Sequence, residues 1–374
     1  MGNSLLAVRG INHKYIVVVR RLIMEKVNNA EGAKHNYILG QRELAIKVPE
    51  YEMIKDYAIW NYMNPFNKKE LQYHYTDING FIGIMNNQEL WASNTKFLND
   101  KAEGKEGLRL TKEIITEHLE KGGLNVYFEC LNMDLQKVIN SGSKEDIYSI
   151  SFCRESDLLS QWRGYGKNGG IAIGFNFTYK EEEYLGRKSV LPHSFLDRNY
   201  YENTEKDDNK FLPQEGEWIH LFQVIYDPKE QRRILDDIIC LGSEAVEYYI
   251  NTRKPSDAIE EIQNISQNII NTIEYFLPLF KNSGFKEENE VRYIWRNDGK
   301  RKIYFRERNG IIFPYLRCML RDLNCQQLNE LPIDDIVIGP QINQNEVKES
   351  VTYYLQHNNY EYLIDKVRLS VSAK

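Results

Sequence analysis

The chain has 374 residues, 42% hydrophobic and 27% charged, which is enough for one large domain or two modest ones. The formal net charge of −6 excludes a protein whose whole surface is a nucleic-acid footprint, because such surfaces carry a strong basic excess. Near the start, the apolar run Tyr15–Val19 is far shorter than the roughly 20 residues that a bilayer requires, and no secretory cleavage site follows it. We therefore expect a cytoplasmic protein without membrane attachment.

The cysteines are odd in number and lack both a Cys-x-x-Cys pair and a histidine at zinc-site spacing. They are Cys130, Cys153, Cys240, Cys318 and Cys325. This pattern is typical of reduced structural thiols, and we expect no metal site.

Residues 1–70 are expected to be an N-terminal appendage with one helix at 51–63, and residues 71–374 the main domain. Asp77 can cap a helix that follows a short strand. The sequence pattern predicts strands at 73–76 and 89–93 and helices at 78–85, 105–119 and 125–139.

In the middle of the chain, two strands at 147–153 and 171–175 flank an expected loop at 161–166. Apolar residues alternate with Ser149 and Ser151 along the first strand, which places both serines on one face.

The last third is predicted to begin with a strand at 219–226 and a helical insertion at 228–280. Asn297-Asp298-Gly299 is a turn sequence between two apolar runs, so 291–295 and 302–305 are expected to pair as a hairpin. A strand at 311–316 is followed by a βαβ-like tail with elements at 336–340, 345–356 and 367–371.

Several motifs in combination resemble a widespread bacterial family of domains of unknown function, family 2971, over residues 73–371. They include Tyr73-His74-Tyr75-Thr76, Phe97-Leu98-Asn99-Asp100, Gln161-Trp162-Arg163-Gly164-Tyr165 and Glu288-Asn289-Glu290-Val291-Arg292. That family carries no assigned activity.

A second resemblance implies an activity. A His on an early strand, a Ser-x-Ser strand and a Glu-x-Glu before a late strand resemble the three-part signature of the ADP-ribosyltransferase fold. The opening is also similar to that of the DNA-modifying transferase toxins. The resemblance implies an α+β fold, a split and mostly antiparallel sheet around an NAD+ cleft, with the helical insertion added. It also implies a bacterial toxin or anti-phage defence effector.

In this interpretation NAD+ is a substrate and its glycosidic bond breaks through an oxocarbenium-like state, which a carboxylate stabilises. The resemblance implies that His74 holds a ribose hydroxyl, that Ser149 or Ser151 braces the site, and that Glu290 is the catalytic carboxylate. Glu288 is expected to act mainly in transfer to the acceptor. Tyr75 and Thr76, next to His74, are also expected to contact NAD+.

The segment Trp162–Gly166 is a further candidate for the NAD+ site. Arg163 between Trp162 and Tyr165, with glycines that allow close backbone approach, suits a nucleotide diphosphate and a stacked ring. The chain departs from the transferase pattern because a His opening usually goes with a Tyr in the middle, a role that Tyr165 or Tyr75 would fill.

Each motif also has a structural interpretation. His74 can be a hydrogen-bonded structural residue, and the serines can be the polar face of a half-buried strand. The two glutamates can be solvated charges before a hairpin, or Glu290 can pair across strands with a basic residue. A basic run in the late strands suits RNA or DNA, or is a solvated hairpin face; its members are Arg296, Lys300, Arg301, Lys302, Arg306 and Arg308.

The favoured function is ADP-ribosyl transfer to a macromolecule, either nucleic acid or protein. The alternatives are NAD+ hydrolysis and a nucleotide-binding sensor without turnover. The sequence names neither the acceptor nor the oligomeric state.

Overall fold

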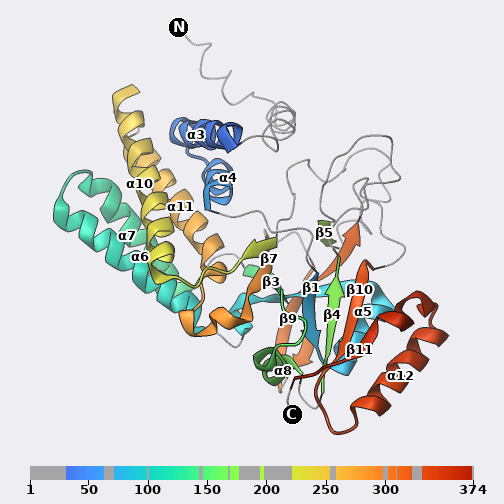
Figure 1. Ribbon diagram of the computed structural model, residues 1–374. Helices are drawn as coiled ribbons and strands as arrows, with labels where there is room; N and C mark the ends of the chain where they lie inside the picture. Colours follow the sequence, from blue (N-terminus) through green and yellow to red (C-terminus); the bar gives the residue numbers. More distant parts are fainter. Residues whose placement is uncertain are drawn as a thin grey trace.

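The computed structural model describes residues 31–62, 71–98, 101–142, 146–166, 169–176, 194–197, 221–252, 258–297, 302–308, 310–321 and 331–372. Six helices gather on one side of the molecule and a large sheet forms the other, with α12 at the far end of the sheet (Figure 1). The helices on that side are α3 (Glu31–Lys47), α4 (Tyr51–Tyr62), α6 (Lys101–Lys121), α7 (Asn125–Ser141), α10 (Pro228–Thr252) and α11 (Ala258–Phe276). The other described α-helices are α5 (Ile78–Asn87), α8 (Leu159–Tyr165) and α12 (Gln344–His357).

The described strands join in one sheet that is antiparallel except where β10 and β11 pair. They are β1 (Gln72–Thr76), β2 (Glu89–Asn94), β3 (Asp146–Cys153), β4 (Ile171–Phe175), β5 (Ser194–Asp197), β6 (Leu221–Gln223), β7 (Glu290–Asn297), β8 (Tyr304–Arg308), β9 (Ile311–Arg321), β10 (Ile333–Ile338) and β11 (Val367–Leu369). The main path runs β11-β10-β4-β1-β3-β2-β9-β5, while β7 and β6 continue from β3, and β8 pairs with β9. The expectation of a mixed fold with a mostly antiparallel sheet is therefore confirmed.

The helical layer forms because its helices are amphipathic. On α11, buried Ile262, Ile265, Ile269 and Ile273 recur at three- and four-residue spacing. This stripe belongs to a core shared with α4, α6, α7 and α10, which also contains Phe222 and other strand residues that link it to the sheet.

Helices α3 and α4 come from the segment expected to be an appendage, and they pack into the same helical layer. Buried Tyr57 of α4 donates a hydrogen bond to Asp237 of α10 at 2.9 Å, and Arg42 of α3 forms an ion pair with Glu244. This part of residues 1–70 therefore shares its core with the rest of the chain.

Several local predictions are confirmed. Asp77 caps α5 by accepting the backbone N–H of Gly80 at 2.7 Å. The tail is a βαβ unit, since β10 and β11 are parallel and α12 connects them. In the part of the chain that the structure describes, none of the helices has the length and hydropathy that a membrane crossing requires.

The predicted hairpin between 291–295 and 302–305 is wrong. One edge of β7 pairs with β3 along its whole length, from Cys153↔Glu290 to Asp146↔Asn297, and the other edge pairs with β6 over residues 291–293. The observed hairpin joins β8 to β9 instead, with Arg308 opposite Ile311. The turn sequence at 297–299 lies where β7 ends, and residues 298–301 lie outside the described residues.

The segment predicted as a loop at 161–166 contains most of helix α8. Helix α8 is only seven residues long, and it forms because its buried residues Gln161 and Trp162 pack against the sheet. Tertiary packing thus overrides a local sequence in which two glycines favour a turn.

Candidate functional site

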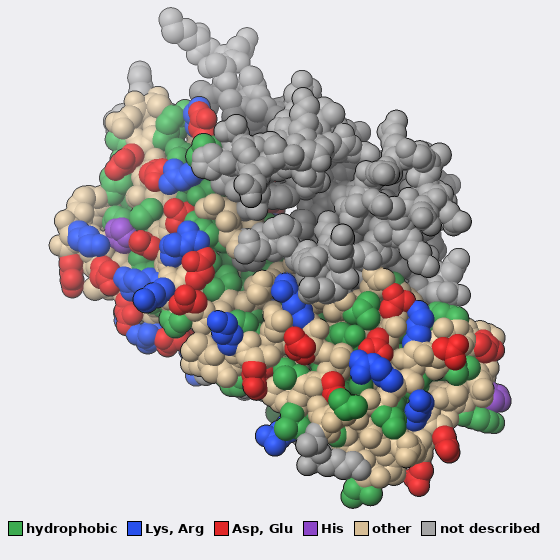
Figure 2. Space-filling view, in the orientation of Figure 1, with side chains coloured by type: hydrophobic (Ala, Val, Ile, Leu, Met, Phe, Trp, Pro, Cys, Tyr) green, Lys and Arg blue, Asp and Glu red, His purple; other side chains and the backbone are tan. Residues whose placement is uncertain are grey.

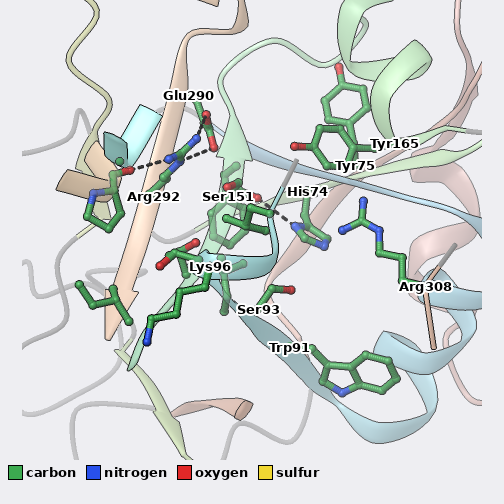
Figure 3. Close-up of a pocket in the computed structure, with 18 of the residues that line it drawn as sticks. His74, Tyr75, Trp91, Ser93, Lys96, Ser151, Tyr165, Glu290, Arg292 and Arg308 are labelled. Atoms are coloured by element: carbon green, nitrogen blue, oxygen red, sulfur yellow. Dashed lines mark hydrogen bonds and ion pairs between the residues drawn. The ribbon is translucent and has the colours of Figure 1, made fainter. Parts of the chain in front are cut away.

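A pocket of about 870 Å³ opens beside strand β3, with walls from β1, β2, β3, β7, β8 and α8. This volume lies within the range typical of small-molecule sites, roughly 300–1,000 Å³. In the pocket, Ser151 lies between His74 on one side and Glu290 with Arg292 on the other (Figure 3).

The pocket exists because the sheet divides along one edge of β3. On that edge β2 pairs with β3 at Tyr148 and Ser149, whereas β1 pairs with it at Cys153. The two strands thus diverge around Ser151, whose carbonyl oxygen accepts a hydrogen bond from His74 Nδ1 at 3.0 Å. The His74 side chain therefore gives the Ser151 carbonyl the hydrogen bond that a neighbouring strand would give it in a continuous sheet.

His74 is a neutral imidazole with a defined tautomer. Burial lowers its pKa to about 4, and the positive charges of Arg306 and Arg308 act in the same direction, outweighing the hydrogen bond to Ser151. Because a carbonyl can only accept, Nδ1 carries the proton and Nε2 keeps its lone pair. His74 therefore offers a hydrogen-bond acceptor to a ligand.

The lowered pKa of His74 predicts how stability depends on pH. Between the ordinary value of 6.5 and about 4, the unfolded chain binds a proton at His74 that the folded chain does not. The free energy of unfolding should therefore fall as the pH falls through this window. Urea titrations at several pH values should show that the free energy of unfolding falls less steeply with pH in His74→Gln than in the wild type. Glutamine still has an amide donor for the Ser151 carbonyl. Equal slopes in both proteins would contradict a neutral His74.

Glu290 is the first residue of β7 and its side chain is 5% exposed. Oε1 accepts from Arg292 Nε at 2.7 Å, and Oε2 accepts from Arg292 Nη2 at 2.8 Å and from Lys281 Nζ at 3.1 Å. Burial alone would raise the pKa of Glu290, but these two cations and the Ser151 hydroxyl lower it to about 2. The pocket therefore contains a permanently ionised carboxylate held in one position.

Glu288 and Glu290 have separate surroundings because the chain turns sharply between them. Asn289 adopts a left-handed conformation with φ of 42° and ends the short 3-10 helix Ser283–Glu288. Glu288 faces Lys281, whose Nζ lies 2.8 Å from its Oε2, and does not line the pocket. Of the two acids in the motif, Glu290 is the one in the pocket.

Arg306 of β8 lines the same pocket as Glu290. Its Nη2 donates to Ser93 Oγ at 2.8 Å, and its guanidinium lies 5.2 Å from the Trp91 ring centroid. Burial lowers the pKa of Arg306 to about 10, and repulsion from Arg308 adds to this. Among the described residues Arg306 has no carboxylate partner, so its charge is available to an anion.

Arg308 lies two residues further along the same face of β8. It stacks between Tyr165 at 5.8 Å and Phe313 at 5.7 Å, and within the described ranges its guanidinium makes no hydrogen bond or ion pair. Figure 3 shows it beside the ring of His74. Two adjacent guanidinium groups that form no ion pair within the described residues favour an anionic ligand with oxygen acceptors, such as phosphate.

Two polar atoms of the pocket residues are buried without a hydrogen-bond partner in the described structure. They are Ser149 Oγ and Arg306 Nε. An unsatisfied buried polar group usually costs about 1–3 kcal/mol, so a ligand that binds these atoms would recover that cost.

The segment Trp162–Gly166, predicted to bind the diphosphate, is divided by the structure. Trp162 is a core residue: it contacts Tyr75 edge-on at 4.6 Å, and an added Cβ at Gly339 would lie 2.8 Å from its ring. Arg163 is exposed and does not line the pocket, whereas Tyr165 lines it.

Tyr75 and Thr76 also line the pocket, but the Tyr75 hydroxyl is already engaged. It donates to the Glu155 carbonyl at 2.7 Å and accepts the Leu158 N–H at 3.0 Å. Of the two tyrosines considered for the middle of the signature, Tyr165 is therefore the better candidate to contact a ligand in the pocket.

The basic run of the late strands does not form one patch. Arg306 and Arg308 enter the pocket, while Arg296 lies 4.6 Å from the Tyr51 ring in the helical layer. Lys302 is exposed and lies 5.0 Å from the Tyr304 ring, and Lys300 and Arg301 lie outside the described residues.

Sequence reasoning missed the pocket role of several residues. Arg306 and Arg308 alternate with Phe305 and Glu307, a period-two signal that places both arginines on one strand face. No sequence signal indicates that Lys281 pairs with Glu290, because this ion pair depends on a contact between β7 and the segment that follows α11.

Comparison with known families adds one finding. Residues 161–293 match the model of a family described as a protein of unknown function (DUF2971). This stretch runs from α8 into β7, so it includes Glu290 and Arg292 but not His74, Ser151 or Arg308. No curated protein and no solved structure matches the chain.

Proposed function

We propose that the pocket binds NAD+ and breaks the bond between nicotinamide and ribose, with transfer of ADP-ribose to a macromolecule. One observation carries this proposal: His74, Ser151 and Glu290, from the adjacent strands β1, β3 and β7, line a single pocket. They follow the chain order of the ADP-ribosyltransferase signature, and the division of the sheet beside β3 resembles the split sheet expected of that fold.

The charges suit a dinucleotide. Arg306 and Arg308 can bind the pyrophosphate, since neither has a carboxylate partner in the described part of the chain. His74 Nε2 can accept a hydrogen bond from a ribose hydroxyl, and Ser149 Oγ is a buried group in need of a partner. Aromatic Trp91 and Tyr165 supply faces for a ring.

In the proposed reaction Glu290 stabilises the transition state. As the C–N bond breaks, its electron pair leaves with nicotinamide and positive charge develops on the ribose. A fixed carboxylate stabilises that charge without having to reorganise. An oxygen or nitrogen of the acceptor then bonds to the ribose carbon and loses its proton, whereas water in that position gives hydrolysis.

A second candidate is a nucleotide sensor without turnover, and one observation favours it. Arg292 already donates a hydrogen bond to each oxygen of Glu290, so part of the negative charge is compensated. Such a site binds a dinucleotide but stabilises an oxocarbenium less well.

Incubation with NAD+ labelled on the adenylate phosphate separates these functions. Transfer is expected to release nicotinamide and to leave the label on a polymer from cell RNA, DNA or protein fractions. Free labelled ADP-ribose indicates hydrolysis, whereas binding by calorimetry without nicotinamide release indicates a sensor. Absence of NAD+ binding would reject all three functions.

A nucleic acid is one acceptor that this proposal allows, and the segment 300–302 would contact it. Neutralising Lys300, Arg301 and Lys302 together should weaken acceptor binding and reduce the slope of log affinity against log salt by about 2–3, near 0.7–0.9 per phosphate contact. Fluorescence anisotropy at several salt concentrations measures this slope. An unchanged slope would leave the segment a solvated surface.

A further inference from the structure

Helices α6 and α10 bring together three side chains of different chemistry, none of which lines the pocket. His118 of α6 and Asp236 of α10 approach within 2.8 Å, from Nε2 to Oδ1. Cys240, one turn along α10, places its Sγ 3.9 Å from His118 Nε2 and 4.0 Å from Asp236 Oδ1. The three donor atoms thus lie within 4.8 Å of one another.

These separations are close to those of a tetrahedral metal site. With zinc bonds of about 2.0–2.1 Å to nitrogen and oxygen and 2.3 Å to sulfur, donor atoms lie roughly 3.3–3.6 Å apart. The imidazole and carboxylate therefore need to separate by about half an ångström, and the thiol needs to approach by a similar distance. Small side-chain rotations achieve both.

The surroundings favour a cation. Besides Asp236, the carboxylates of Asp237 and Glu244 act electrostatically on Cys240, and Arg42 is the opposing charge. The His118 ring is held by stacking on Phe128, at 4.8 Å with an interplanar angle of 7°. A fixed imidazole in a negative field is a suitable ligand for a divalent ion.

We propose that His118, Asp236 and Cys240 bind a divalent transition metal of the zinc class. The side chains of His118 and Asp236 are 21% and 49% exposed, so an ion reaches the site from solvent. The ion would displace the thiol proton of Cys240 and leave one position for water, and it would cross-link two helices of the layer. Acidic and basic side chains are interspersed on the visible face of this layer (Figure 2).

The test uses the full chain, reduced and stripped of metal. Co²⁺ should produce the absorption of a thiolate–metal bond, and Zn²⁺ should abolish that absorption by competition and raise the Tm. Cys240→Ser, which is nearly isosteric, should lose the thiolate absorption, and both it and His118→Ala should bind Zn²⁺ at least about 100-fold more weakly, since even outer-shell partners of a metal are worth about 10–100-fold.

Cys130→Ser is the matched control, because Cys130 is a partly buried free thiol of α7 in the same helical layer. It should retain the Co²⁺ absorption and the Zn²⁺ affinity. If wild-type protein gives no thiolate absorption with Co²⁺, or if Cys240→Ser binds Zn²⁺ as tightly as wild type, there is no metal site at this position.

Discussion

Glu290→Gln is expected to slow nicotinamide release by about 10²–10³-fold while NAD+ affinity stays nearly unchanged. That loss is the usual effect of removing one electrostatic group that stabilises a transition state. Glutamine keeps the size of Glu290 and one acceptor oxygen, but its amide nitrogen cannot accept from Arg292 or Lys281, and it removes the charge proposed to face the ribose. Single-turnover assays of nicotinamide release, with calorimetry for NAD+ binding, measure the two effects separately.

Stability must be measured alongside, because Glu290 also pairs with two buried cations. Leaving a buried ion unpaired typically costs about 3–5 kcal/mol, and less is expected here because Glu288 still pairs with Lys281. Glu288→Gln is the matched control, since it removes the other Lys281 partner but leaves the pocket carboxylate in place. If both variants lose activity equally, the carboxylate acts through the ion-pair network, and near wild-type release by folded Glu290→Gln would disprove its catalytic role.

Replacing Arg306 and Arg308 together with alanine should weaken NAD+ binding by roughly 10²–10⁴-fold. Each charge-assisted hydrogen bond is worth about 1.5–3 kcal/mol, and 1.4 kcal/mol corresponds to a factor of ten. The loss should be similar for ADP-ribose, which has the same pyrophosphate, and much smaller for nicotinamide riboside. Calorimetry with the three ligands therefore identifies the group that the arginines bind.

Two controls each remove one positive charge from outside the pocket. Lys302→Ala removes a cation just before the same strand, and Arg163→Ala removes the exposed guanidinium first expected to bind the diphosphate. Neither side chain lines the pocket, so both variants should bind NAD+ as wild type does. If Arg163→Ala weakens binding as much as the double variant, the pyrophosphate lies outside this pocket.

The sequence was most informative where local signals and packing agree. Asp77 before an apolar helical stripe and the alternation along β3 were both correctly interpreted. The turn signal at 297–299 misled because it shows where a strand ends but not which strand pairs with it. Pairing of β7 with β3, about 140 residues away in sequence, depends on the whole sheet.

The site was predictable only in part. His74, Ser151 and Glu290 were selected from their order along the chain, and the structure brings them together in one pocket. The sequence could not show that Trp162 is buried against Gly339 while Arg163 points outward. Nor could ligand spacing show His118 beside Cys240, because the two lie on different helices.

The two sides of the pocket belong to parts of the sheet with unequal local stability. Glu290 lies on β7, which pairs with β3 on one edge and with β6 on the other, so exposing it requires both pairings to be lost. Arg306 and Arg308 lie on β8, which in the described structure pairs with β9 alone. The guanidinium side can therefore fluctuate as a single hairpin while the carboxylate side stays fixed, and a ligand that bridges the two sides would lower the entropy of β8 far more than that of β7.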